Sequence, residues 1–245
     1  ILGTSSPDRN YPSDACSVQA AIGAVNAVAF DISAACAGFI FAMNIVEGFF
    51  KAGIYKTALI IGAETLSKVT DWSDRGTCVL FGDGAGAAVL KAEETGIIDM
   101  MMGADGTKGD VLACTSRTVG NFLTGTKPEL GFMTMDGQEV FKFAVRKVPE
   151  SVMELLQRTG TKKEDIKYYV LHQANERIIE AAARRLKEPM EKFPMTIGQF
   201  GNTSTASIPL LLNDMIQKDM LKRGDKIIMS GFGAGMTWGA VLMEW

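Results

Sequence analysis

The sequence contains a single histidine, His172, and only four cysteines, which lie far apart along the chain. No C-x-x-C pair is present, so neither a four-cysteine zinc site nor a disulfide framework is expected. One histidine is also too few for a histidine-based zinc centre. These scarcities predict a metal-free protein that works in the reducing cytoplasm.

Long uncharged apolar runs and an excess of positive charge are missing as well. The most apolar stretch, residues 34–50, contains Asn44 and Glu47 and is too short to span a bilayer comfortably, so no membrane contact is expected. Lys and Arg number 25 against 28 Asp and Glu, and the formal charge of −3 argues against bulk binding to nucleic acid. An acidic partner must therefore meet a local basic patch.

What remains is the composition of an ordinary globular protein. The 245 residues are 47% hydrophobic and 22% charged, which allows one large domain or two small ones. Short β-branched runs alternate with longer helical stretches, a pattern typical of α/β proteins whose sheets are covered on both faces. The expected strands are Ile1–Ser5, Ala29–Ser33, Thr57–Gly62, Gly86–Lys91, Tyr168–Leu171, Lys226–Ser230 and Gly239–Trp245, and the expected helices are Ser13–Val25, Ala37–Ala52, Gly137–Gly160, Glu176–Leu186 and Ser207–Lys218.

Two segments of the chain resemble each other, Val79–Glu93 and Met229–Trp245. Each reads as a strand, a Phe-Gly-x-Gly turn and a second apolar strand, so we predict two related halves around one centre. The segment between the halves is rich in Gly, Thr, Met and Asp, which suggests loops over a pocket. The expected organisation is an N-terminal half (1–98), a pocket-covering insert (99–136) and a C-terminal half (137–245).

Cys36 is the first candidate for chemistry, because it lies between an expected strand and an expected helix. Free N–H groups and the macrodipole at a helix start favour a thiolate, which would make this cysteine a nucleophile. Small neighbours on both sides would let a substrate approach. The alternative is an inert buried thiol, since free cysteine is among the most buried residue types.

Two polar residues and a glycine-rich loop are further candidates. His172 follows the strand that ends at Leu171, the position where open α/β sheets place reactive groups, although a lone histidine is also a common core residue. Asn202 lies in a turn and, taken alone, is explained by turn or cap preferences. The loop Gly231–Gly239 is either a tight hairpin or a source of backbone N–H groups for an oxyanion.

Taken together, these motifs resemble those of the β-ketoacyl-acyl-carrier-protein synthase III family, condensing enzymes that initiate fatty acid synthesis. The resemblance runs over the whole chain and rests on AACAGF around Cys36, DRGT at 74–77, FGDGAGAAVL at 81–90, HQAN at 172–175, GNTS at 201–204 and the loop GFGAGMTWG. It implies a thiolase-like fold with two pseudo-repeated halves and mixed five-stranded sheets in α-β-α-β-α layering. The first half would be incomplete, because family members begin with further elements, so a bare sheet edge and exposed apolar surface are expected.

The resemblance also implies roles for the candidate residues. Cys36 would take the acyl group from acyl-CoA, by default acetyl-CoA, and His172 and Asn202 would polarise the thioester carbonyl of malonyl-acyl-carrier protein. No cofactor is needed, since coenzyme A arrives as a substrate thioester. The backbone N–H groups of Cys36 and Ala234 would hold the oxyanion. Ala234 departs from the glycine that is common in the family, and a positive φ there would cost about 1 kcal/mol.

More peripheral roles follow from the same resemblance. Arg75 matches a residue at the adenine end of the CoA channel, and the arginines of the helix after His172 match a basic patch that docks the acidic carrier protein. A homodimer is expected, with Tyr11 reaching the neighbouring subunit's pocket. Ordinary packing or solvation is the alternative for all of these positions. The acyl-pocket candidates are Tyr11, Leu66, Phe81, Met133 and Phe232, and the docking candidates are Arg177, Arg184 and Arg185.

Related enzymes fit the sequence less well. Elongating synthases use two histidines, and thiolases use a second cysteine where GNTS places Asn202. Papain-like hydrolases have a different sequence around the cysteine. Two alternatives stay open, a synthase III-like enzyme of polyketide or secondary metabolism and a truncated, non-catalytic homologue that binds only the carrier protein.

Overall fold

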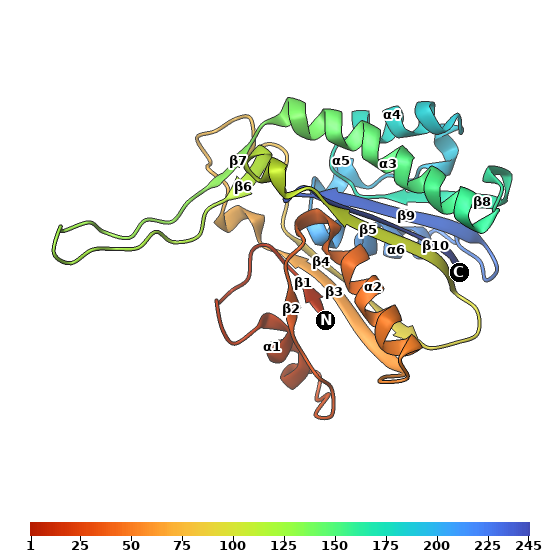
Figure 1. Ribbon diagram of the computed structural model, residues 1–245, viewed down its shortest axis with the longest axis horizontal. Helices are drawn as coiled ribbons and strands as arrows, with labels where there is room; N and C mark the ends of the chain where they lie inside the picture. Colours follow the sequence, from red (N-terminus) through yellow and green to blue (C-terminus); the bar gives the residue numbers. More distant parts are fainter.

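The computed structural model describes all 245 residues and contains two four-stranded sheets (Figure 1). In the first sheet the strand order is β2-β1-β3-β4, with β1 parallel to both neighbours and β4 antiparallel to β3. In the second sheet the order is β5-β10-β9-β8, and only the β8–β9 pair is parallel. A short ladder pairs β6 with β7. The strands are β1 Leu2–Gly3, β2 Asp31–Ile32, β3 Thr57–Glu64, β4 Gly84–Lys91, β5 Ile97–Ala104, β6 Leu112–Cys114, β7 Met133–Met135, β8 Ile166–Leu171, β9 Lys226–Gly233 and β10 Thr237–Glu244.

The helices separate and cover the sheets in the expected α-β-α-β-α order. Helices α2 and α6 contact both sheets and form the central layer, while α3 covers the outer face of the second sheet with α4 beside it (Figure 1). Helix α1 lies on the outer face of the first sheet. The α-helices are α1 Asp14–Ala21, α2 Gly38–Lys51, α3 Gly137–Thr159, α4 Glu176–Leu186, α5 Ile197–Phe200 and α6 Ser207–Gln217. The 3₁₀ turns are η1 Ala35–Ala37, η2 Leu66–Lys68, η3 Gly106–Val111, η4 Lys163–Asp165, η5 Met190–Lys192 and η6 Ser204–Ala206.

Apolar residues explain this layering. Helix α2 carries only two charged residues, Glu47 and Lys51, both in its C-terminal part, and is otherwise largely apolar, as suits a helix between two sheets. Strand β9 is buried at seven of its eight positions because helices cover both faces of its sheet. Strand β4 instead alternates between half-buried and exposed residues, since its outer face has little cover.

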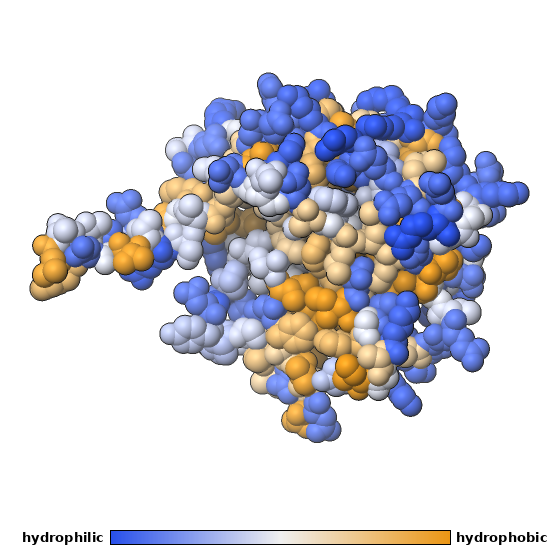
Figure 2. All heavy atoms as spheres, viewed as in Figure 1, coloured by the Kyte–Doolittle hydropathy of each residue, from blue (hydrophilic) through white to orange (hydrophobic).

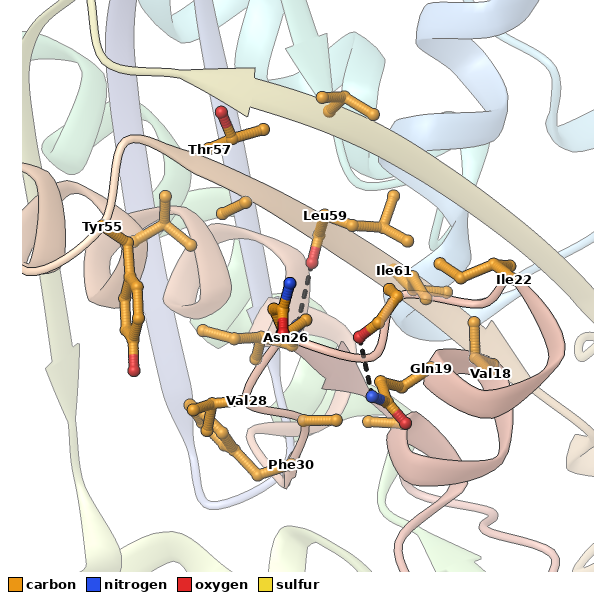
Figure 3. A pocket seen from close by; sticks show the side chains of 18 of the residues that line it. Val18, Gln19, Ile22, Asn26, Val28, Phe30, Tyr55, Thr57, Leu59 and Ile61 are labelled. Atoms are coloured by element: carbon orange, nitrogen blue, oxygen red, sulfur yellow. Dashed lines mark hydrogen bonds between the residues drawn. The ribbon is translucent and has the colours of Figure 1, made fainter.

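The outer face of the first sheet carries the exposed apolar surface that the sequence predicts. A hollow of about 510 Å³ opens between α1, residues 24–30 and β3, and 16 of its 19 lining residues are hydrophobic (Figure 3). The backbone nitrogen of Ile1 donates to the Leu59 carbonyl at its floor (2.8 Å). Apolar side chains also gather over the first sheet in Figure 2, whereas the surface of α3 and α4 is mostly hydrophilic. No helix is both long and apolar enough to cross a bilayer.

Several expectations need correction. The insert is not all loop, because Ile97–Ala104 forms β5 and pairs along β10, where Met100 and Met101 pack against the two cores. The second sheet has four strands rather than five, with β5 and β8 at its edges, whereas the four strands of the first sheet agree with the expected incomplete first half. The expected strands at residues 1–5 and 29–33 shrink to two residues each, and the expected helix at 13–25 ends at Ala21. Residues 115–131 extend away from the body instead of covering a pocket (Figure 1).

Candidate active site

Cys36 lies in the η1 turn that leads into α2, and only 7% of it is exposed. Burial raises the pKa of its thiol from 9.0 to about 12, although the Ser204 side chain lowers it through a hydrogen bond; the Glu64 carboxylate raises it further. Burial therefore opposes the thiolate that a helix start alone would favour, because desolvation outweighs the helix dipole. The thiol is protonated until a reaction removes its proton.

His172 follows β8 and is almost completely buried. Burial lowers the pKa of its imidazole from 6.5 to about 3, so the ring is neutral at physiological pH. Its Nδ1 lies 2.6 Å from the Ser207 Oγ, which also accepts the Gln173 N–H (3.3 Å). Nδ1 is the one acceptor within reach of the Ser207 hydroxyl, so we assign the hydroxyl as the donor. This assignment leaves the proton on Nε2 and makes the imidazole a neutral donor.

Asn202 is held by a short parallel bridge to residue 81, in which its backbone N–H donates to the Leu80 carbonyl (2.9 Å). The chain reverses just before it at Gly201, where φ is +65°, a conformation that favours glycine. The side-chain Oδ1 accepts the Ser204 N–H at 2.8 Å. Because that bond occupies the oxygen, the amide NH₂ group is left as the free donor of Asn202.

These three residues line one cavity of about 220 Å³. They come from the η1 turn before α2, the residue after β8 and the turn before η6, so the fold brings together segments from both halves of the chain. Phe81 and Phe232 line the same space, and Phe232 meets the His172 ring edge to face with centroids 5.4 Å apart. Hydrophobic residues make up ten of the sixteen in the lining, which makes this a largely apolar cavity with a few polar donors.

The glycine-rich loop places Gly233, rather than Ala234, in the cavity wall. A Cβ added at Gly233 would lie 2.5 Å from the backbone nitrogen of Cys36, so only glycine lets the two backbones meet this closely. Ala234 lies just beyond β9 and packs against the core of the second sheet. Its φ is not positive, so the strain considered for an alanine here does not arise. A glycine within an apolar strand was the available signal for Gly233.

Three of the five acyl-pocket candidates do not line the cavity. Leu66 and Met133 are buried elsewhere, and Tyr11 is 85% exposed. Apolar residues of β6, β7, α3 and α4 line the cavity instead. The sequence pattern does not identify them, because packing between distant elements decides which residues they meet. These residues are Leu112, Met135, Val140, Phe141 and Ile178.

The basic candidates lie outside the cavity on the surface. Arg75 is exposed and forms no ion pair, and its neighbour Gly76 lines the cavity. On α4, Arg184 is exposed 3.8 Å from the Glu180 carboxylate, and Arg185 donates to the Val145 carbonyl of α3 (3.2 Å).

Arg177 connects the basic surface with the cavity. Its guanidinium lies 5.6 Å from the ring centroid of Phe141, a residue of the cavity wall. Within the chain, no group of three or more His, Cys, Asp or Glu residues is arranged to hold a metal ion.

Comparisons with known proteins identify the family of this chain. The family model for 3-oxoacyl-[acyl-carrier-protein] synthase III matches residues 30–106, and the model for its C-terminal part matches residues 156–245. The β-ketoacyl-[acyl-carrier-protein] synthase III of Clostridium acetobutylicum is 51% identical over 247 residues, which cover all of this chain and 76% of that protein. The chain belongs to the 3-oxoacyl-[acyl-carrier-protein] synthase III family.

Solved structures of the synthase III family confirm the thiolase-like fold. The enzyme of Aquifex aeolicus superposes with a TM-score of 0.91 at 45% identity, and that of Thermus thermophilus with 0.92 at 41%. Both matches cover the whole of this chain and 76% of the solved one. The chain thus spans about three quarters of the length of these synthases, and it is an enzyme of the 3-oxoacyl-acyl-carrier-protein synthase type.

Proposed function

We propose that Cys36, His172 and Asn202 form the catalytic triad of a decarboxylative Claisen condensation. The substrates are a short acyl-CoA, by default acetyl-CoA, and malonyl-acyl-carrier protein, and the products are 3-oxoacyl-carrier protein, CoA and CO₂. The observation that carries the proposal is that a nucleophile and two neutral donors line one largely apolar cavity. No cofactor enters the reaction.

The first step transfers the acyl group to Cys36. The sulfur forms a bond to the acyl carbon as the thioester bond to CoA breaks, and the thiol proton leaves with the CoA sulfur. Since burial keeps the resting thiol protonated, the proton is lost only as the attack proceeds. The Cys36 N–H, at the start of the 3₁₀ turn, is the proposed donor to the oxyanion of the tetrahedral intermediate.

The second step forms the carbon–carbon bond. Malonyl carboxylate leaves as CO₂, and its bonding electrons pass to an enolate whose oxygen accepts from His172 Nε2–H and the Asn202 amide. Both donors are neutral, so they stabilise the negative oxygen without protonating the adjacent carbon. That carbon attacks the acyl carbon, and the Cys36 sulfur departs and takes up a proton.

The surrounding surface suits the larger substrates. We propose that Arg177, Arg184 and Arg185 dock the acidic carrier protein beside the cavity, and that the exposed Arg75 binds the adenine end of CoA. A cytoplasmic homodimer is proposed as well, and the exposure of Tyr11 supports a role for this side chain in a neighbouring subunit.

Incubation with acetyl-CoA followed by intact mass spectrometry tests the proposal. We expect one acetyl group on Cys36 in the wild type and none in Cys36→Ser. Asn202→Ala should still be acetylated but should fail to condense malonyl-carrier protein, because its amide acts only on the enolate. A correctly folded wild type that takes no acetyl group would instead be a non-catalytic carrier-protein-binding homologue.

A further inference from the structure

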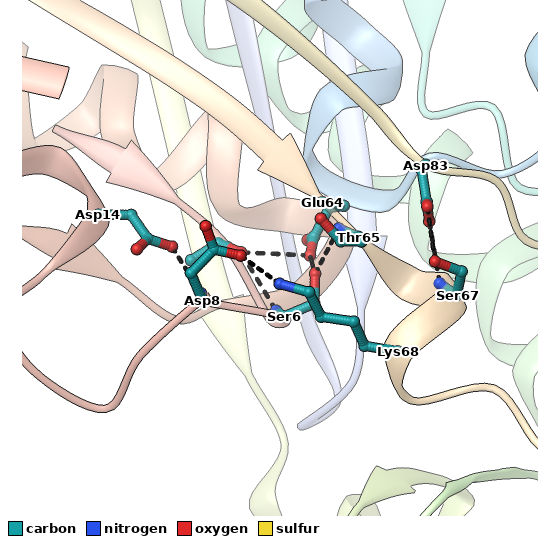
Figure 4. Close-up of polar contacts among 9 residues, drawn as sticks. Ser6, Asp8, Asp14, Glu64, Thr65, Ser67, Lys68 and Asp83 are labelled. Carbon is teal, nitrogen blue, oxygen red and sulfur yellow. Dashed lines mark hydrogen bonds and ion pairs between the residues drawn. The ribbon is translucent and has the colours of Figure 1, made fainter. Parts of the chain in front are cut away.

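Glu64, at the end of β3, is a buried carboxylate that the proposed reaction does not use. Only 5% of it is exposed, and it forms no ion pair with lysine, arginine or histidine. Neutral donors surround it instead. Its Oε2 accepts from the Ser6 hydroxyl (2.6 Å; Figure 4) and from the Ser5 N–H (3.0 Å). Burying a carboxyl group without a cation beside it is costly, so its position calls for a reason.

The other oxygen of Glu64 faces Thr205, which comes from the C-terminal half. The Thr205 hydroxyl lies 3.0 Å from Glu64 Oε1 and 2.8 Å from the carbonyl oxygen of Ala35. Thr205 itself fills a niche between three glycines of the N-terminal half. A Cβ added at Gly3, Gly38 or Gly62 would meet Thr205 atoms at 2.7, 3.0 and 2.4 Å. Gly3 and Gly38 thus leave room for the Thr205 side chain, and Gly62 leaves room for its backbone.

This contact joins the two halves of the proposed active site. Thr205 lies three residues after Asn202 in the same turn, and Ala35 directly precedes Cys36. The hydroxyl therefore links the turn that presents the amide to the turn that presents the nucleophile, across 170 positions of sequence. The other side-chain hydrogen bond between the two turns joins Ser204 to Cys36.

We propose that Thr205, oriented by Glu64, is a positioning residue that sets the distance between the Cys36 and Asn202 turns during condensation. The inference rests on the proposed function, because it assigns separate half-reactions to the two turns. Acyl loading uses Cys36 without Asn202, whereas condensation needs the thioester and the enolate donors aligned. Loss of the Thr205 hydroxyl should therefore slow condensation more than loading.

Two substitutions at Thr205 separate the hydrogen bond from packing. Thr205→Ser keeps the hydroxyl and loses the methyl group, whereas Thr205→Val keeps the shape and loses the hydroxyl. We expect Thr205→Ser to retain condensation within about threefold and Thr205→Val to lose about tenfold or more, with loading little changed. Thr203→Val is the matched control, because the Thr203 hydroxyl is buried in the same turn with no partner, and it should leave both rates unchanged.

The opposite ranking overturns the proposal, since Val would outperform Ser if Thr205 only filled space. Equal loss of loading and condensation in Thr205→Val also overturns it. A wild type that is not acetylated refutes the proposed function instead, so the two failures are distinct.

Glu64→Gln tests the carboxylate separately and does not depend on whether Thr205→Val folds. Turned toward Ser5 and Ser6, the new NH₂ group would face two donors; turned toward Thr205, it would donate to the hydroxyl oxygen instead of accepting from it. The orientation of the Thr205 hydroxyl therefore changes, and condensation should slow more than loading. The substitution also removes a negative charge that opposes ionisation of Cys36. Alkylation of Cys36 by iodoacetamide should therefore shift to lower pH in Glu64→Gln and not in Thr205→Val. An unshifted alkylation profile together with unchanged condensation would refute the role of Glu64.

Discussion

Gly233→Ala is the sharpest perturbation of the proposed oxyanion site. The added Cβ would lie 2.5 Å from the Cys36 nitrogen, 3.0 Å from the Ala35 Cβ and 3.2 Å from the Ala37 nitrogen. Ordinary contact begins at 3.4 Å, so the backbones must separate by about 0.9 Å, the difference between 3.4 and 2.5 Å. The φ of Gly233 is not positive, which makes contact rather than backbone strain the cause.

Two effects of this separation can be measured. Overpacking of this kind costs about 1–3 kcal/mol of unfolding free energy, which should lower the melting temperature by a few degrees. Displacing the nucleophile by about 1 Å and crowding its N–H should lower the acetylation rate of Cys36 about 100-fold.

Gly48→Ala is the matched control, because Gly48 is a helical glycine with nothing within 4 Å of an added Cβ. Rapid-quench acetylation with mass detection gives the rates, and calorimetry gives the melting temperatures. If Gly233→Ala matched Gly48→Ala in both measurements, the close approach of β9 to the nucleophile would have no functional meaning.

Three further outcomes are expected. Ser207→Ala should move the His172 proton away from Nε2 and slow condensation about tenfold. Because the chain has one histidine, ¹⁵N-histidine NMR reports the tautomer directly. An unchanged spectrum in Ser207→Ala would contradict our assignment. The pKa of His172 is lowered to about 3 in the folded protein, so only the unfolded chain takes up this proton below pH 6.5, and stability should fall as pH drops from 6.5 toward 3. Urea unfolding at pH 7 and pH 5 measures this effect, and the free energy of unfolding should fall less between the two pH values in His172→Gln than in the wild type. Arg177→Glu should raise the KM for malonyl-carrier protein several-fold and spare acetyl-CoA loading. The control Arg223→Glu, before the start of β9 and far from the cavity, should change neither. Equal loss of both steps in Arg177→Glu would argue against docking.

Local patterns predicted the longer elements well. Helix α4 has the predicted bounds Glu176–Leu186, because its apolar residues recur at helical spacing and the Asn175 side chain caps it. The edge elements were predicted poorly. Strands β1 and β2 keep only two paired residues each, and β5 looked like a loop because its glycine and methionines have weak strand propensity until they pair with β10.

The sequence by itself determined which reactive groups exist, their motifs and the family to which they belong. Only the tertiary structure decided the environment of each group. Burial, which depends on all the layers at once, keeps Cys36 protonated and His172 neutral, whereas a helix start alone favours a thiolate. The contacts of Gly233, Ser207 and Thr205 likewise could not be predicted from local sequence, although a glycine within an apolar strand marks position 233 itself. Each joins segments far apart in the chain, and such distances are set only when the sheets and helices pack.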